Sequence, residues 1–158
     1  PEDIDETWRG IVFGGEFELG DIFTTADSFK MAGDKLVEIA HKNHEERELF
    51  QPAIYNYRHA TELYIKSVTG EEINHNLHDL LLKLKDVLKN EFNASPPEWF
   101  ENIIEVFHYS DPKGKAFRYG ITVPKEELYA DMRQVKTLMN WLSVSFKRIK
   151  VERLKTNY

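Results

Sequence analysis

Apolar residues in most of this chain recur every three to four positions, which is the spacing of one face of an α-helix. The first such stripe, in residues 25–43, is formed by Phe29, Ala32, Gly33, Leu36 and Ala40. The second begins near Pro52, which a first helical turn tolerates, and ends before Gly70, a favourable residue after a helix. Its predicted inner face is Ile54, Tyr57, Thr61, Tyr64, Ile65 and Val68, with His59, Leu63 and Lys66 on the outer side.

Three further stripes follow. Residues 76–90 place Leu77, Leu80, Leu81, Leu84, Val87 and Leu88 on one face. The motif SPPE predicts the next helix start through a capping box of Ser95 and Glu98, and the inward residues are then Trp99, Ile103, Val106 and Phe107. After a glycine-containing loop at 111–121, Thr122 and Pro124 predict the start of a final helix of about six turns. Its inner face is Leu128, Met132, Val135, Leu138, Met139, Leu142, Phe146 and Ile149.

Residues 1–24 do not share this spacing. The segment WRGIVFGGEFELGDIF has four glycines among apolar residues, which favours extended or turning backbone over a helix. The chain shows no internal repeat, low-complexity tract or linker. The sequence therefore predicts an all-α protein: a single bundle of about five helices in residues 25–158, with an irregular N-terminal segment, residues 1–24, packed on its core.

The composition excludes several classes of protein. A chain of 158 residues is long enough for one domain with its own core, and a net charge of -6 argues against a chain-wide grip on nucleic acid. The absence of cysteine excludes disulfides, thiolate metal sites and cysteine nucleophiles. No apolar run approaches the roughly 20 residues of a membrane span, and the acidic start PEDIDETWRG does not resemble a signal peptide. We therefore expect a cytoplasmic protein without membrane contact.

Four pairs of residues have the i, i+3 spacing of metal ligands on a helix and are therefore candidates for a metal site: Glu38–His41, Glu105–His108, His41–His44 and His75–His78. The two Glu-x-x-His pairs have the spacing of di-iron or di-manganese sites in helical bundles. By helical geometry they point away from the inner stripes, whereas the ligands of a metal in the bundle centre point inward. The histidine pairs have no third ligand fixed by the sequence. We predict no metal site and no cofactor.

The stretch YNYRHATELYIKS, residues 55–67, places charged residues within the second stripe. Arg58 and Glu62 stand four apart on the edge of the inner face, and Glu62 precedes Lys66 in the order that favours an ion pair. One interpretation is a charged flank that stabilises its own helix. In the other, Arg58 is partly buried and meets a carboxylate from elsewhere, either Asp79 or Asp111.

The loop DPKGKAFRYG, residues 111–120, gathers cations in an otherwise acidic chain. Asp111 and the proline after it predict a turn. Lys113, Lys115, Arg118 and Tyr119 have the side chains to hold a phosphate and stack on a base. The alternative is that the arginine pairs internally with a carboxylate of the loop or of the second helix, while the lysines are solvated.

The last helix predicts a surface for partners. Its end, FKRIKVERLKTNY, has five basic residues and a single glutamate, which suits RNA or an acidic partner. Trp141 and Val144 lie behind its inner stripe, and Leu63 lies behind that of the second helix. Apolar residues that face outward are candidate contacts in a dimer.

The segments PAIYNYRHATELYIKSV and NHNLHDLLLKL resemble the HEPN superfamily (higher eukaryotes and prokaryotes nucleotide-binding domain). Ala60, Glu62 and Lys66 match the Ala-x-Glu-x-x-x-Lys core of the family's second helix, and His75 or His78 matches its His-x-Leu segment. The loop DPKGKAFRYG is similar to the Asp…Phe-Arg-Tyr loop of some bacterial members. The resemblance covers roughly residues 25–149. It implies an all-α bundle that dimerises and that belongs to toxin–antitoxin or other prokaryotic defence systems.

Many members of the superfamily are metal-independent RNases with an Arg-x(4–6)-His motif. No arginine of this chain has a histidine at that distance; the arginines are Arg9, Arg47, Arg58, Arg118, Arg133, Arg148 and Arg153. A metal-free RNase needs a general acid or base and a cation for the developing phosphorane charge. Here only the fold can assemble them, from Arg58 and His59 or from Arg118 and His75.

The leading hypothesis is a HEPN-like, non-catalytic homodimer that binds a nucleotide, RNA or a cognate partner protein in a prokaryotic defence or toxin–antitoxin setting. One alternative is a metal-independent RNase toxin with an unconventional Arg/His site. Another is a purely structural dimerisation module. No catalytic residue is assigned, and the candidate binding residues are Arg58, His59, Glu62, Lys66, His75, Asp111, Lys113, Lys115, Arg118 and Tyr119.

Overall fold

The computed structural model describes residues 21–42, 47–111 and 130–156. These ranges contain five α-helices, one short 3-10 helix and no strand, which confirms the predicted all-α class. The elements are α2 (Ile22–Lys42), η1 (Arg47–Leu49), α3 (Phe50–Thr69), α4 (Leu77–Phe92), α5 (Glu98–Ser110) and α7 (Met132–Thr156). The predicted irregular N-terminal segment lies outside the described residues up to residue 20, and α2 already begins at Ile22 rather than at residue 25.

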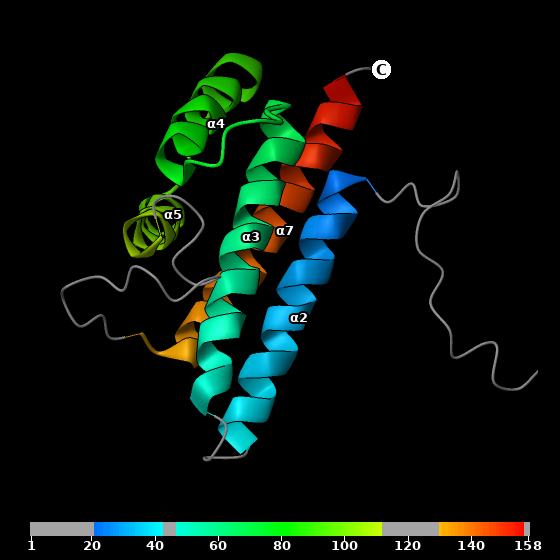
Figure 1. Ribbon diagram of the computed structural model, residues 1–158. Coiled ribbons are helices and arrows are strands. Elements are labelled where there is room, and N and C mark those ends of the chain that lie inside the picture. The colour runs from blue at the N-terminus through cyan, green and yellow to red at the C-terminus, as the bar shows by residue number, and fades with distance from the viewer. Residues whose placement is uncertain (1–20, 43–46, 112–129, 157–158) are drawn as a thin grey trace, which may run out of the picture.

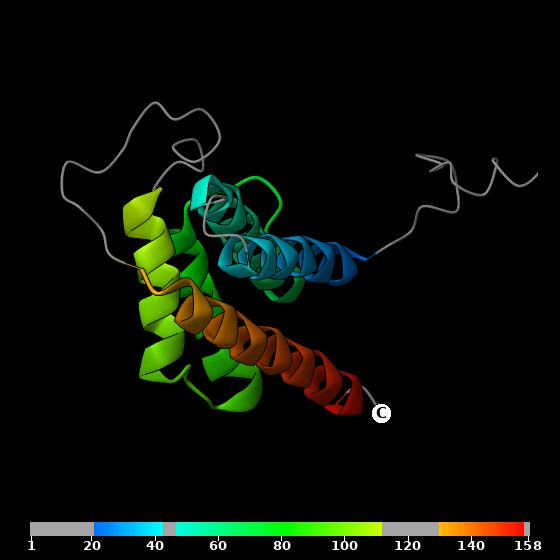
Figure 2. The ribbon, with the colours of Figure 1, turned by 90° about the horizontal axis from the view of Figure 1, so that it is seen from below.

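Helix α3 is the centre of the bundle. It contacts α2, α4 and α7, and α2 and α3 lie side by side along most of their length with the chain running in opposite directions (Figure 1). Seen from below, α7 runs obliquely beside this pair, and α4 and α5 lie together at one side of the molecule (Figure 2). A helix with neighbours on several sides buries some of its polar residues together with its apolar ones.

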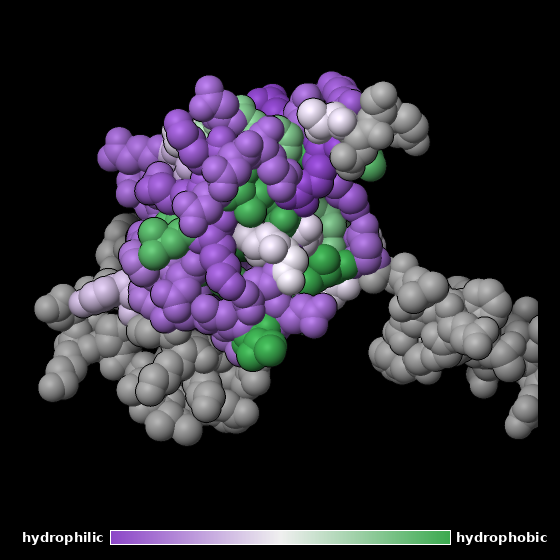
Figure 3. All heavy atoms as spheres, turned by 90° about the horizontal axis from the view of Figure 1, so that it is seen from above, coloured by the Kyte–Doolittle hydropathy of each residue, from purple (hydrophilic) through white to green (hydrophobic). Residues whose placement is uncertain are grey.

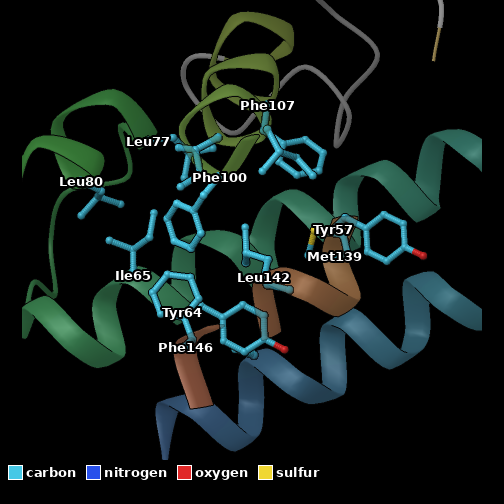
Figure 4. Close-up of a cluster of buried hydrophobic side chains, with 14 of the residues drawn as sticks. Tyr57, Tyr64, Ile65, Leu77, Leu80, Phe100, Phe107, Met139, Leu142 and Phe146 are labelled. Carbon is cyan, nitrogen blue, oxygen red and sulfur yellow. The ribbon is translucent and has the colours of Figure 1, made fainter. Parts of the chain in front are cut away.

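Aromatic side chains from three helices form the middle of the core. The ring of Tyr64 on α3 stacks on Phe146 of α7 with centroids 5.3 Å apart, and Phe100 of α5 lies 5.4 Å from Phe146 (Figure 4). Met139 and Leu142 of α7 are fully buried beside them. The predicted inner faces of the second and last helices are therefore confirmed in this cluster.

A close approach joins α2 to α3 at Gly33. A Cβ atom on this glycine would lie 2.6 Å from Cε1 of Tyr57, so no larger residue fits without movement of the ring. Tyr57 is fully buried, and its hydroxyl donates to Oδ1 of Asp34 at 2.8 Å. The hydrogen bond holds the ring over the glycine, which explains why the two helices pack so closely.

Most of the predicted inward residues of α2 and α5 are buried or packed against the core, but one residue in each helix was placed wrongly. In α2, Ala32 is exposed, and the buried residues are Phe23, Ala26, Gly33, Val37 and Ala40. In α5, Val106 is exposed, and the buried residues are Phe100, Ile103, Ile104, Phe107 and Ser110. Apolar residues cover more than one face in both segments, so the sequence pattern alone does not select the face that packs.

The predicted helix starts also differ from the structure. Helix α5 begins at Glu98 with Pro97 as its N-cap residue and no side-chain cap, so the capping box of Ser95 and Glu98 is wrong. Helix α7 begins at Met132, where Asp131 accepts hydrogen bonds from the N–H groups of Arg133 and Gln134. Residues 130–131 are not helical, so the predicted continuous helix from 122 is wrong there, while residues 112–129, with Leu128, lie outside the described part.

Two other helix ends have capping residues typical of their positions. Gly70 ends α3 with a φ of 70°, and its N–H donates to the carbonyl of Lys66, as expected of a glycine after a helix. Asn76 caps α4 by accepting from the N–H of Asp79. The face of the molecule seen from above is mostly hydrophilic, with a few hydrophobic patches between the polar residues (Figure 3). No helix in the described ranges has both the length and the apolar character to cross a membrane.

Candidate functional site

Three charged residues of α3 are buried on one side of the helix. Arg58, Glu62 and Lys66 are spaced four residues apart, and they are 2%, 3% and 5% exposed. The loop between α3 and α4 and the end of α5 lie close enough to bond to this side of the helix. The prediction that Lys66 faces outward is therefore wrong, because α3 is covered on this side too.

Arg58 connects three segments of the chain. Its Nε donates to the backbone carbonyl of Asp111 at 3.0 Å, one terminal nitrogen donates to Oε2 of Glu62 at 3.1 Å, and the other donates to the carbonyl of His75 at 3.1 Å. Its Nε also lies 3.8 Å from a carboxylate oxygen of Asp111. Of the two interpretations of this arginine, the structure shows the buried one, and the partner is Asp111 rather than Asp79.

Lys66 completes the arrangement from the next helical turn. Its Nζ lies 3.0 Å from Oε1 of Glu62 and donates to the carbonyl of Glu72 at 3.1 Å. His75 places Nδ1 2.7 Å from the same Oε1. We call Arg58, Glu62, Lys66, His75 and Asp111 the Glu62 network.

The charge of Glu62 depends on these partners. Burial by itself would raise the pKa of its carboxyl group. The hydrogen bonds from His75 and Lys66, together with the charges of Lys66 and Arg58, outweigh burial and hold the pKa below its ordinary value. Glu62 is therefore ionised at neutral pH, and its Oε1 accepts a hydrogen bond from Nδ1–H of His75.

His75 is the exposed member of the network. Its side chain is 66% exposed, whereas that of Glu62 is 4% exposed. The ionised Glu62 can only accept, so Nδ1 of His75 carries a proton, and in the neutral imidazole the other ring nitrogen, Nε2, is then an acceptor for a ligand or for a reacting proton. This geometry can orient a general base, but the donors of Arg58 and Lys66 are buried and directed at protein oxygens.

The remaining candidate residues divide into two groups. The His59 ring lies edge-on to Phe29, with centroids 4.4 Å apart, and stacks on Tyr55, so its observed contacts are outside the Glu62 network. Lys113, Lys115, Arg118 and Tyr119 lie outside the described residues. Their predicted contact with a phosphate or with the second helix stays a prediction.

A second histidine–carboxylate pair joins α4 to α5. Nδ1 of His78 lies 2.7 Å from Oε1 of Glu105, and the His78 ring is 5.8 Å from that of His108. This pair was not predicted, because its members lie on different helices and helical periodicity relates only residues within one helix. Within the described residues, no group of three or more His, Asp or Glu side chains has the geometry to hold a metal ion.

All five residues of the Glu62 network are candidates predicted from the sequence, but the backbone contacts of the network were not predicted. Three of the observed bonds end on backbone carbonyls, those of Glu72, His75 and Asp111. Every residue has a carbonyl, so side-chain identity gives no sign of such a contact. The i, i+4 spacing of Arg58, Glu62 and Lys66 and the predicted Arg58–Asp111 pair agree with the observed contacts.

Comparisons of this chain with protein-family models, with curated proteins and with solved structures find no match. The resemblance to the HEPN superfamily therefore rests on the sequence segments alone.

Proposed function

We propose that this protein is a HEPN-like, non-catalytic helical dimer that binds a nucleotide, an RNA or a partner protein in a prokaryotic defence or toxin–antitoxin setting. The observation that supports the non-catalytic part is the burial of Arg58 and Lys66 in the Glu62 network. The donors of both cations are directed at protein oxygens, so they hold the α3–α4 loop and the end of α5 in place. Cations used in this way cannot stabilise charge on a substrate.

The outer face of α7 supports the dimer. Trp141 and Val144 are 53% and 61% exposed, and Val151 lies on the same face two turns further on. The Trp141 ring meets Trp99 of α5 edge-on at 5.6 Å, which extends the apolar surface onto a second helix. Leu63, the other predicted contact, is partly buried against the core. The proposed contact with a second copy is therefore formed by α7.

Sedimentation measures this dimer directly. Val144→Asp places a charge in the contact, so we expect this variant to be monomeric at concentrations at which the parent protein is dimeric. Leu82→Asp, a comparable change at an exposed position of α4, is the matched control and should remain dimeric. Lys147 and Arg148 beside the stripe are exposed and have no ion pair among the described residues, so added salt should strengthen a symmetric α7–α7 contact. A parent protein that is monomeric at every salt concentration contradicts the dimer.

A second candidate function is a metal-independent RNase, and His75 is the observation that favours it. An exposed imidazole held by a buried carboxylate is a suitable general base. If the chain cuts RNA in EDTA, His75→Ala should abolish the cutting, and His78→Ala, which removes an exposed histidine next to a more exposed glutamate, should not. The RNase alternative drawn from the sequence also involves Arg118 and His59, so Arg118→Ala and His59→Ala are further variants for the same assay. RNA that stays intact after long incubation with the parent protein supports the non-catalytic function.

A further inference from the structure

A pocket between the end of α2 and the start of α7 is rich in hydrogen-bond donors. It has a volume of about 520 Å³. Val37, Glu38, His41 and Lys42 line it from the last turns of α2, and Arg133, Lys136, Thr137 and Asn140 line it from α7. A volume of this order is typical of sites for small molecules, which measure roughly 300–1,000 Å³.

The residues that line the pocket carry more positive than negative charge, whereas the chain as a whole is negatively charged. Lys42, Arg133 and Lys136 are cations, and Glu38 is the one carboxylate among the lining residues, in a chain with a net charge of -6. The hydrogen bonds from Lys136 and from Lys35, outside the pocket, lower the pKa of Glu38. Glu38 lies 2.9 Å from Nζ of Lys136, so it is committed to one of the three cations of the lining.

Of the remaining donors, the Thr137 hydroxyl donates to the carbonyl of Arg133, and three others have no partner in the described part of the protein. The side chains of Lys42, Arg133 and Asn140 make no hydrogen bond or ion pair with other described residues. They come from two helices that are distant in the sequence and reach the same pocket. A planar guanidinium, an ammonium and an amide NH₂ group together are suited to an oxyanion with several acceptor oxygens.

We infer that this pocket binds the phosphate or pyrophosphate group of a small molecule. Arg133 and Lys42 neutralise the group, Asn140 donates an uncharged hydrogen bond, and Lys136 remains on Glu38 at the edge. Since Asp131 accepts from the first N–H groups of α7, the side chains rather than the helix terminus recognise the anion. The inference rests on the ligand-binding part of the proposed function and gives the anionic group of the ligand a position.

The first measurement is a titration of the ¹⁵N-labelled chain with inorganic pyrophosphate at constant ionic strength, followed by NMR. We expect saturable shifts in the amide signals of the pocket, at residues 37–42 and 133–140. Parallel titrations with inorganic phosphate, AMP and ATP distinguish the source of the group. Tighter binding of ATP than of pyrophosphate identifies a nucleotide, whereas equal affinities identify the phosphate group alone.

Matched variants test the assignment. Asn140→Asp puts a carboxylate of nearly the same shape into the pocket, and we expect pyrophosphate affinity to fall about tenfold or more. Asn102→Asp makes the same change at an exposed asparagine of α5 and should keep the parent affinity. Arg133→Ala should weaken binding as well. Each variant is checked for an unchanged amide spectrum, so that a loss of binding is not confused with a loss of folding.

Four results would overturn the proposed phosphate site. Shifts that spread over exposed lysines in proportion to anion concentration would show unspecific attraction. Equal loss of affinity in Asn140→Asp and Asn102→Asp, or no shift with any of the four compounds, would show that the pocket holds no phosphate group. If ATP instead shifts signals of another region, the pocket assignment is wrong while nucleotide binding by the protein stands.

Discussion

Two histidines of this protein stand three residues apart and make the same contact in different surroundings. His75 and His78 each place Nδ1 2.7 Å from a glutamate oxygen. The partner of His75 is Glu62, whose side chain is 4% exposed, and the partner of His78 is Glu105, whose side chain is 42% exposed. A contact distance therefore says little about the importance of a pair until the solvation of both groups is known.

The surroundings determine what else each pair holds. Glu62 also binds Arg58 and Lys66, and these cations reach the carbonyls of three other residues. Among the described residues, Glu105 has His78 as its one partner, at a surface where water competes. We expect disruption of the Glu62 network to lower the free energy of unfolding measurably. Disruption of the His78–Glu105 pair should hardly change it.

The largest effect is expected for Arg58→Ala. The change leaves Glu62 without one of its buried cations and leaves two backbone carbonyls without a donor, so the free energy of unfolding should fall by about 3–5 kcal/mol. Urea unfolding measures it. Lys85→Ala, which breaks the more exposed ion pair with Glu101, is the control and should lose about 1 kcal/mol or less. Similar losses in the two variants would mean that burial does not distinguish them.

Glu62→Gln should have the next largest effect and should change the response to acid. At neutral pH the loss of the charged acceptor should lower the free energy of unfolding by about 1.5–3 kcal/mol. Because the pKa of Glu62 is lower in the folded protein than its ordinary 4.5, the unfolded chain takes up the proton first, and the contribution of Glu62 disappears as the pH falls below that value. Stability measured from pH 7 to pH 3 should therefore decline less steeply in the variant. An equal decline in both proteins would contradict this role of Glu62.

His75→Ala should have a smaller effect on stability. It removes one donor to Glu62, while Lys66 remains on the same oxygen and the backbone carbonyl of residue 75 remains available to Arg58. We expect a loss of about 1 kcal/mol in thermal or urea unfolding. Hydrogen exchange of the loop at residues 71–76 should stay close to that of the parent protein. Rapid exchange throughout this loop would show that the imidazole, rather than Arg58, holds it.

His78→Ala should have the smallest effect. Both members of this pair are substantially exposed, so we expect a change of about 0.5 kcal/mol or less. The difference from the parent protein should vanish in about 1 M salt, where the Debye length is about 3 Å. Unfolding curves at low and high salt measure this. A loss as large as that of His75→Ala, and independent of salt, would remove the contrast between the two pairs.

Much of the fold was predictable because helical periodicity is a local property. The stripe of Leu77, Leu80, Leu81, Leu84 and Leu88 is buried as expected, and Gly70 ends α3 as expected. Val106 and Ala32 were placed inward and are exposed. Each belongs to a segment with apolar residues on more than one face, and which face packs depends on the neighbouring helices.

The candidate site was predictable as a set of residues but not as an arrangement. Arg58, Glu62 and Lys66 have the same i, i+4 spacing on an exposed helix as on a buried one. Nothing in that spacing shows that the carbonyls of Glu72, His75 and Asp111 approach them. The donors around Asn140 were missed for the same reason, because they come from helices that are distant in the chain.

The sequence by itself determined that the chain is helical and which residues carry charge on its second predicted helix, since both depend on neighbours within one or two turns. The tertiary structure decided that α3 is enclosed, and thereby that an ordinary pattern of surface ion pairs became the buried Glu62 network. The physical reason is solvation: water weakens the charges of an exposed helix, and only the packing of other segments against α3 removes that water.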